Sequence, residues 1–108
     1  MSYYEHTLIL KSDLPESQVK TVINKYEDII KKNSGKILKT EKWGLKSFSY
    51  IIKNNRKGFY IHIKLEGIGK TIEELEKAEN IDQMLIRYLT IKVKNHDLKT
   101  EYFEKKDL

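Results

Sequence analysis

One stretch decides the fold of this chain, residues 36–66, with the sequence KILKTEKWGLKSFSYIIKNNRKGFYIHIKLE. Apolar and polar side chains alternate along residues 59–66, and a shorter alternation covers residues 47–53. Period-two alternation is typical of β-strands with one buried face. Residues 54–58, NNRKG, tolerate positive φ and predict a turn between the two strands, and Gly44 predicts a β-bulge in the first strand. The sequence therefore predicts a long β-hairpin at the centre of the fold.

The same hairpin carries the positive charge of the protein. Residues 36–64 contain eight basic residues and one acidic residue, Glu41, and so have a net charge of +7, whereas the whole chain of 108 residues has +5. A concentrated basic surface predicts an anionic partner, with nucleic acid favoured over membrane. Lysines along an exposed strand also fit a second role, which is to prevent edge-to-edge pairing with another sheet.

The flanking segments complete a strand, helix, strand, strand, helix, strand order. Residues 3–10 alternate as a strand, and residues 84–94 are rich in β-branched and aromatic residues, with breaks that predict a bulge. We expect a first helix capped by Ser12 or Asp13 and ended by Gly35, and a second helix that starts with a capping box at Thr71. The first helix has an apolar stripe formed by Val19, Val22, Ile23, Tyr26, Ile29 and Ile30. The surface of the second is expected to be acidic, with Glu73, Glu74, Glu76, Glu79 and Asp82.

This order predicts an α+β, ferredoxin-like fold of the split β-α-β type (βαββαβ). Such a fold has a four-stranded antiparallel sheet with both helices on one face and the other face open. We expect residues 1–94 to form a single domain and residues 95–108 to form a polar, flexible C-terminal tail.

Several classes of function are disfavoured by what the sequence lacks. The chain has no cysteine, so disulfides and thiolate metal sites are excluded. The absence of a long apolar run and of a signal-peptide pattern predicts a cytoplasmic protein without a membrane span. His6, His62 and His96 have no metal-binding spacing, and we interpret them as a partly buried, a surface and a tail histidine, respectively. No phosphate-binding glycine motif is present. We therefore expect no catalytic residues, no metal, no cofactor and no small-molecule substrate.

The hairpin offers chemistry for RNA binding. Residues 57–59, KGF, are similar to the start of the third-strand signature of RNA-recognition-motif domains, but Ile61 and Ile63 stand where that signature has aromatic residues. Tyr60 and His62 on the open face are candidates for base stacking, and they fit a partly solvated sheet face equally well. The preponderance of Lys over Arg favours phosphate contacts over readout of base edges.

Short elements along residues 3–94 resemble the bacterial small-subunit ribosomal protein six family. These elements are Tyr4-Glu5, Trp43-Gly44-Leu45-Lys46, Tyr50-x-Ile52, Gly58-Phe59-Tyr60, Glu66 and Leu85-x-Arg87. The resemblance implies a non-catalytic protein of the ribosome, without a cofactor. It also implies binding to the central domain of small-subunit (16S) ribosomal RNA jointly with small-subunit ribosomal protein eighteen. His62 departs from the family pattern at a position that is often aromatic, and Lys46-Ser47 stand where the family often has two basic residues.

These arguments together predict two sets of contact residues. The ribosomal RNA-binding residues are expected to be Lys42, Trp43, Gly44, Lys46, Lys53, Arg56, Arg87 and Lys92, whereas Tyr60 and His62 are expected to contact the partner protein. A competing class is a ligand-binding or regulatory homodimer of the same fold, which requires a concave apolar site. A third class, an acylphosphatase-like enzyme, requires an Arg and a phosphate-cradling loop after the first strand, where Lys11-Ser12-Asp13 provides neither.

Overall fold

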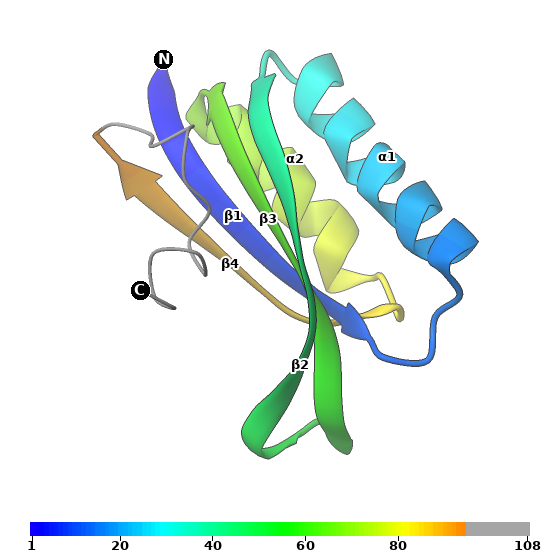
Figure 1. Ribbon diagram of the computed structural model, residues 1–108. Helices are drawn as coiled ribbons and strands as arrows, with labels where there is room; N and C mark the ends of the chain where they lie inside the picture. Colours follow the sequence, from blue (N-terminus) through cyan, green and yellow to red (C-terminus); the bar gives the residue numbers. More distant parts are fainter. Residues whose placement is uncertain (95–108) are drawn as a thin grey trace.

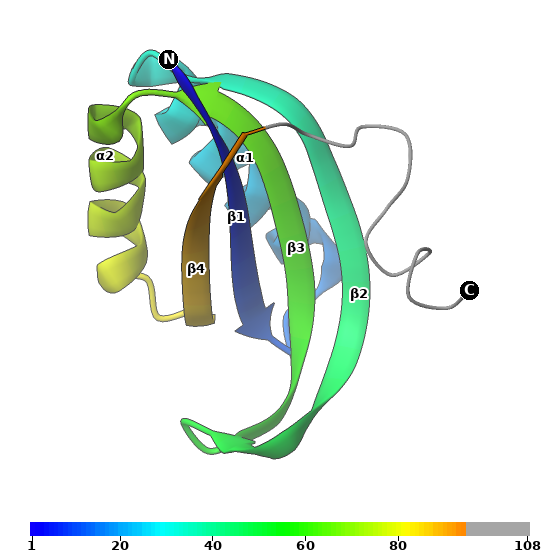
Figure 2. The same cartoon turned by 90° about the vertical axis from the view of Figure 1, so that its left-hand side faces the viewer.

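The architecture is a four-stranded antiparallel sheet with two helices. The computed structural model describes residues 1–94, which form β1 (Ser2–Lys11), α1 (Glu16–Lys32), β2 (Lys36–Ile52), β3 (Asn55–Gly67), α2 (Gly69–Asn80) and β4 (Leu85–Val93). The strand order is β2-β3-β1-β4, and both helices lie against one face of the sheet (Figure 1). Within the described part of the chain, a view from the side shows no helix over the opposite face (Figure 2). This arrangement confirms the predicted ferredoxin-like fold. The tail predicted for residues 95–108, with His96, lies outside the described residues.

The hydrophobic core lies between the helices and the sheet because the apolar stripe of α1 meets the helix-facing side chains of β1 and β3. Tyr26 of α1 is fully buried, and its hydroxyl donates a hydrogen bond to the carboxylate of Asp82, which follows α2. The core cluster comprises Leu8, Leu10, Val19, Val22, Ile23, Tyr26, Ile30, Ile61, Ile63, Leu65, Leu75 and Leu85. The alternation in β1 and β3 and the helical spacing in α1 are thus the patterns that build the core.

One polar pair crosses this core. His6 is fully buried rather than partly buried, with its Nε2 atom 2.6 Å from Oε2 of Glu79 and its Nδ1 atom 2.6 Å from Oγ1 of Thr90. Glu79 therefore does not belong to the acidic surface of α2, as the sequence indicated, but faces the sheet with 3% of its area exposed. Burial raises the pKa of the Glu79 carboxyl. Through Glu79, His6 and Thr90, these two hydrogen bonds connect α2 to β1 and β1 to β4.

Two predictions about the helix ends are wrong, whereas Gly35 ends α1 as predicted, because its amide donates a hydrogen bond to the carbonyl of Ile30. α1 begins after Pro15, whose carbonyl accepts the amides of residues 18 and 19, so neither Ser12 nor Asp13 caps it. The residue with positive φ after α1 is Ser34, at 65°, and not Gly35. Gly35 is required for space, because a Cβ atom there would lie 2.5 Å from Cγ2 of Ile30. Thr71 is the third residue of α2 and not its cap, and its hydroxyl joins the two helix ends by accepting the amide of residue 68 and donating to the carbonyl of residue 33.

The central hairpin has a shorter turn than predicted. Only Lys53 and Asn54 form the turn, with φ of 49° and 65°, whereas residues 55–58 belong to β3. Two consecutive residues with positive φ give the tight turn whose twist matches that of the strands. β2 contains the predicted bulge between Lys42 and Gly44, where Gly44 has a φ of 90°, and a further register shift between residues 37 and 39.

The last strand resolves the ambiguity of its sequence pattern. β4 pairs with β1 and shifts register between Ile9 and Leu10, which confirms the bulge expected there. As a consequence, Arg87, Leu89 and Ile91 pair with open-face residues of β1. Tyr88, Thr90 and Lys92 pair with helix-facing residues.

Candidate nucleic-acid interface

The open face of the sheet is organised as cross-strand rows. One row runs Gly44, Tyr60, Ile9, Arg87 from β2 to β4, and the next runs Glu41, His62, Thr7, Leu89. A third runs Lys39, Lys64, Glu5, Ile91. The β2 and β3 side of the face therefore carries aromatic and charged groups. The β4 side carries Arg87 and two exposed apolar side chains, Leu89 and Ile91, which are exposed by 59% and 52%.

The aromatic groups form a stacked platform. The ring of Trp43 lies parallel to that of His62, with 4.6 Å between centroids and 13° between planes, and it also stacks over Tyr60 at 6.5 Å. Phe48 meets Tyr60 edge-on at 6.3 Å. Because Trp43 is the extra residue of the bulge next to Gly44, the bulge is what turns the indole onto the open face.

His62 lies within this platform and is not the surface residue that the sequence indicated. Only 5% of its area is exposed. Its Nε2 atom lies 2.8 Å from a carboxylate oxygen of Glu5 and its Nδ1 atom 2.8 Å from the hydroxyl of Thr7. A carboxylate can only accept, so Nε2 donates to Glu5, and the neutral ring then accepts from Thr7 at Nδ1. Burial lowers the pKa of His62, which favours this neutral form.

A buried ion pair supports the platform from the β2 side. Glu41 is 1% exposed, accepts a hydrogen bond of 2.8 Å from Nε1 of Trp43, and lies 3.1 Å from Nζ of Lys64. Nζ of Lys39 is 4.0 Å from the same carboxylate. Burial alone would raise the pKa of Glu41, but the hydrogen bonds from Trp43 and Lys64 outweigh it and hold the pKa below its usual value. The one acidic residue of the basic stretch is thus an ionised anchor inside the sheet face.

The structure does not gather all the predicted RNA-binding residues in one place. Lys46 pairs with Gly58 and lies on the open face with Trp43 and Gly44. Lys42 instead pairs with the helix-facing Ile61 and lines a hollow between α1 and β2.

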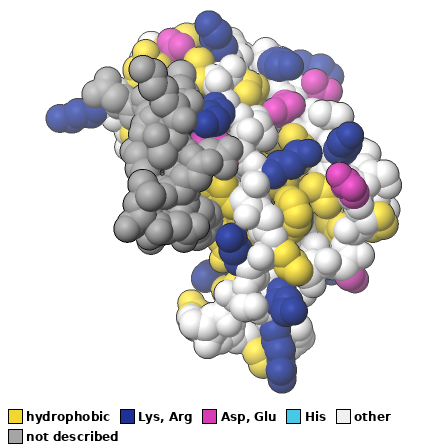
Figure 3. Space-filling view, in the orientation of Figure 1, with side chains coloured by type: hydrophobic (Ala, Val, Ile, Leu, Met, Phe, Trp, Pro, Cys, Tyr) yellow, Lys and Arg dark blue, Asp and Glu magenta, His cyan; other side chains and the backbone are white. Residues whose placement is uncertain are grey.

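The remaining predicted cations divide between the hairpin and the far edge of the sheet. Lys53 and Arg56 lie at the end of the hairpin, where Figure 3 shows dark blue side chains along the projecting part of the molecule. Arg87 and Lys92 lie on β4, at the edge opposite β2. Arg87 lies on the open face in the same cross-strand row as Gly44. Three strand spacings separate the two residues, which is about 14 Å. Lys92 pairs with helix-facing Tyr4.

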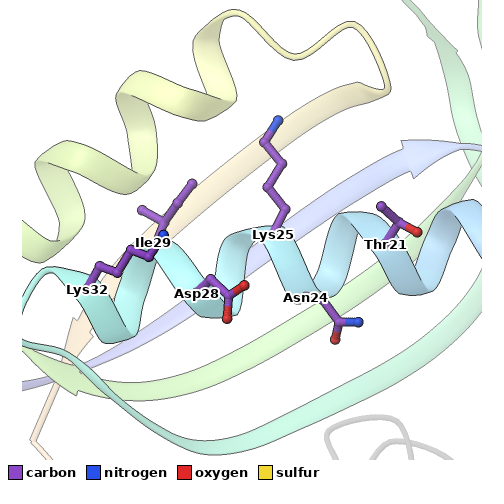
Figure 4. Close-up of a pocket in the computed structure, with 6 residues that line it drawn as sticks. All are labelled: Thr21, Asn24, Lys25, Asp28, Ile29 and Lys32. Atoms are coloured by element: carbon purple, nitrogen blue, oxygen red, sulfur yellow. The ribbon is translucent and has the colours of Figure 1, made fainter.

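Two of the surface hollows lie on opposite sides of the described part of the molecule. The hollow drawn in Figure 4 is about 490 Å³ and lies on the outer side of α1, where Lys25 and Ile29 extend to one side of the helix and Asn24 and Asp28 to the other. A second hollow of about 460 Å³ lies on the open face between Tyr60 and Arg87. Among residues 1–94, no group of three or more acidic, His or Cys side chains is placed to hold a metal ion. No helix in that part of the chain is long and apolar enough to span a membrane.

Sequence reasoning missed the residues that support the platform. The supporting residues come from three strands that are far apart along the chain, with Glu5 and Thr7 on β1, Glu41 on β2 and Lys64 on β3, and only strand register brings them together. The one available signal was the isolation of Glu41 among eight basic residues, since a single acid in such a stretch indicates a specific ion pair.

The fold and this surface define a small ferredoxin-like domain with an open, platform-bearing sheet face and a basic hairpin. The family model for ribosomal protein S6 matches residues 3–92. Small ribosomal subunit protein bS6 of Pelagibacter ubique is 51% identical over 107 residues, which is 99% of this chain and 88% of that protein. The bS6 protein of Bartonella bacilliformis is 35% identical over 90% of this chain and 71% of that protein.

The solved structures agree with this result. The crystal structure of 30S ribosomal protein S6 from Thermotoga maritima superimposes with a TM-score of 0.82 at 29% identity, covering 85% of this chain and 87% of that one. The chain belongs to the ribosomal protein S6 family, as the sequence resemblance indicated. Its homologues are structural, non-enzymatic proteins of the small ribosomal subunit, which places the chain in the ribosome.

Proposed function

We propose that the chain binds the central domain of small-subunit ribosomal RNA jointly with small-subunit ribosomal protein eighteen. One observation carries the RNA part of this proposal. Between Glu41 and Glu66 the chain contains six basic residues and no acidic one, and Lys64 of the six pairs with Glu41. Residues 42–65 of the hairpin therefore contribute basic and no acidic side chains beside a platform of stacked rings, which suits phosphate contacts with support from stacking.

The division of the predicted cations gives each group its own task in this proposal. Lys46, with Trp43 and Gly44, binds RNA from the open face, while Lys42 reaches the same RNA around the edge strand β2. Lys53 and Arg56 extend the contact along the hairpin. Arg87 and Lys92 contact RNA at the other edge of the sheet.

Protein eighteen docks on the open face in this proposal. Tyr60 is half-buried at the border between the platform and the exposed apolar side chains of Leu89 and Ile91, so a partner that covers these apolar groups also meets Tyr60. His62 contributes to this docking mainly indirectly, because its ring stacks against Trp43 and holds the indole in place. Hydrogen exchange of β1 and β4 with and without protein eighteen tests this docking, and unchanged protection of both strands would contradict it.

The RNA contacts are tested by titrating a central-domain RNA fragment in the presence of protein eighteen at several salt concentrations. The double variant Lys42→Ala/Lys46→Ala should weaken binding roughly ten- to thirtyfold and reduce the salt slope by about 1.4–1.8, since each phosphate contact contributes about 0.7–0.9 to that slope. The matched control is Lys70→Ala/Lys77→Ala, which removes two exposed lysines from α2. Equal effects of the two double variants would exclude the hairpin as the specific RNA contact.

A further inference from the structure

The end of the β2–β3 hairpin extends beyond the rest of the sheet. The last pair between β1 and β3 is Lys11 with Gly58, so residues 47–57 have no third strand beside them (Figure 1). Two apolar side chains are nevertheless exposed there, Tyr50 by 66% and Ile51 by 56%. Large exposed side chains on a projecting element are typical of contact surfaces.

The ladder is interrupted where these side chains lie. Ser47 pairs with Lys57 and Ile52 with Asn55, so β2 contributes four residues between the two pairs and β3 contributes one, Arg56. The additional residues of β2 are pushed out of the ladder. A hollow of about 370 Å³ results, lined by Ser47, Phe48, Ser49, Tyr50, Ile51, Arg56 and Lys57.

The two aromatic residues that line this hollow differ in how they pack. Phe48 packs back onto the sheet, where it crosses Gly58 so closely that a Cβ atom on that glycine would lie 2.7 Å from the Phe48 ring, and it meets Tyr60 edge-on. Tyr50, two residues further on the same strand, is two-thirds exposed. Its ring is therefore presented to solvent from a base that Phe48 anchors.

The charges around the hollow favour RNA as its occupant. Lys53, Arg56 and Lys57 surround the tip, and no acidic residue lies between positions 42 and 65. An exposed aromatic ring next to several cations is the combination with which proteins bind single-stranded nucleic acid, where the ring stacks on a base and the cations contact phosphates. A paired base in an A-form helix is stacked on both sides and out of reach in a deep, narrow groove, so only an unpaired base can be stacked upon.

We propose that the hairpin tip binds an unpaired segment of RNA, with Tyr50 stacked on one base and Lys53, Arg56 and Lys57 on the flanking phosphates. This inference rests on the proposed RNA-binding function and adds a specific contact to it. The contact favours RNA loops and bulges over duplex, because a duplex offers the phosphates but not the base.

A fluorescent reporter tests the stacking without ribosomal RNA. The variant Tyr50→Trp, in a Trp43→Phe background that removes the one native tryptophan, places an indole at the tip. Its emission should be quenched by a short single-stranded oligoadenylate and not by inorganic polyphosphate, which supplies charge without bases. The matched control is Ile68→Trp in the same background, because Ile68 is 41% exposed and follows the end of β3 that lies about 30 Å from Gly58. Absence of quenching, or equal quenching of both reporters, overturns the inference.

Affinity for the central-domain fragment with protein eighteen gives the second test. Tyr50→Ala should weaken binding roughly five- to a hundredfold with an unchanged salt slope, and Tyr50→Phe should restore it, because stacking needs the ring and not the hydroxyl. The triple variant Lys53→Ala/Arg56→Ala/Lys57→Ala should instead lower the salt slope by about 2. If the wild-type chain binds the fragment and Tyr50→Ala binds it with the same affinity, the stacking is refuted but the proposed function is not. A wild-type chain that fails to bind the fragment refutes the proposed function, and the reporter titration then still decides the inference.

Discussion

Removing the charge of Glu41 is the perturbation that tests the open-face network most directly. Glu41→Gln keeps the shape of the side chain and an oxygen that can accept from Trp43, but it removes the carboxylate charge that lies 3.1 Å from the buried Nζ of Lys64. Glu41 and Lys64 are 1% and 5% exposed, and their charged groups are 3.1 Å apart. Breaking a buried ion pair by removing one partner costs about 3–5 kcal/mol. We expect the lower end of that range, about 3 kcal/mol, because the amide retains one of the two interactions.

The double variant Glu41→Gln/Lys64→Met separates the ion pair from packing. Removing both charges leaves no uncompensated charge, so most of the loss should be recovered, with a coupling energy of about 2 kcal/mol. Urea unfolding at neutral pH, followed by far-ultraviolet circular dichroism and by the emission of Trp43, measures each free energy of unfolding. With a slope of about 1–3 kcal/mol per molar urea, the single variant should shift the midpoint by about 1–3 M.

The matched control is Glu73→Gln on α2. Glu73 also pairs with a lysine, Lys77, but both side chains are more than 60% exposed, at 66% and 63%. An exposed pair contributes less than about 1 kcal/mol. The reasoning is refuted if Glu41→Gln costs no more than Glu73→Gln, because burial would then have no bearing on the strength of the pair.

Three further variants test other parts of the structure. Because the folded state lowers the pKa of His62, this residue contributes stability above a pH of about 6.5 that is lost as the pH falls through the lowered pKa. The gap in unfolding free energy between wild type and His62→Gln, measured by urea titration at several pH values, should therefore narrow from about pH 7.5 to about pH 5, and a constant gap would contradict this. Gly58→Ala should destabilise by about 1–3 kcal/mol through overpacking, since the new Cβ atom would lie 2.7 Å from the Phe48 ring. Phe48→Leu in the Gly58→Ala chain should relieve part of that loss in thermal unfolding, and a purely additive double variant would argue against the clash. Tyr26→Phe removes the donor to the Asp82 carboxylate and should cost about 1.5–3 kcal/mol in urea unfolding, whereas a neutral result would show that water replaces the hydroxyl.

The parts of the fold that could be predicted are those set by local periodicity. The 3.6-residue stripe of α1 and the alternation of β1 and β3 need only neighbouring residues, and element order then predicts the sheet topology. The helix ends and the hairpin turn were less predictable because they depend on individual φ angles. The turn uses Lys53, a residue type without a preference for positive φ, while Gly58 is a glycine because Phe48 and Ile9 crowd it.

The candidate interface could be predicted in charge but not in geometry. The concentration of lysines on the hairpin follows directly from composition. Which face each lysine occupies depends on the bulge at Trp43, so Lys42 and Lys46 lie on opposite faces although they are four residues apart. The burial of His62 depends on Glu5 and Thr7, which lie on the neighbouring strand β1 and more than fifty residues away in the chain. No local sequence pattern contains that information.

The first two of the three register shifts in β2, at residues 37–39 and 42–44, have a consequence for how the strand tolerates insertions and deletions. Before residue 38, the even-numbered Lys36 pairs with an open-face residue of β3. Between the two shifts, the odd-numbered Lys39 and Glu41 pair with open-face residues. After Trp43, the even-numbered Gly44 and Lys46 pair with open-face residues again. Each extra residue shifts the phase of the alternation by one, and the second shift restores the phase that the first one changed. Deleting the extra residue at either irregularity would therefore remove the bulge and leave the pairs on both sides unchanged, with Lys46 still on the open face. Deleting a residue between the two irregularities, such as Thr40, would instead exchange the faces of Glu41 and Lys42, and loss of the bulge at Trp43 would then restore the pairing of Gly44 with Tyr60.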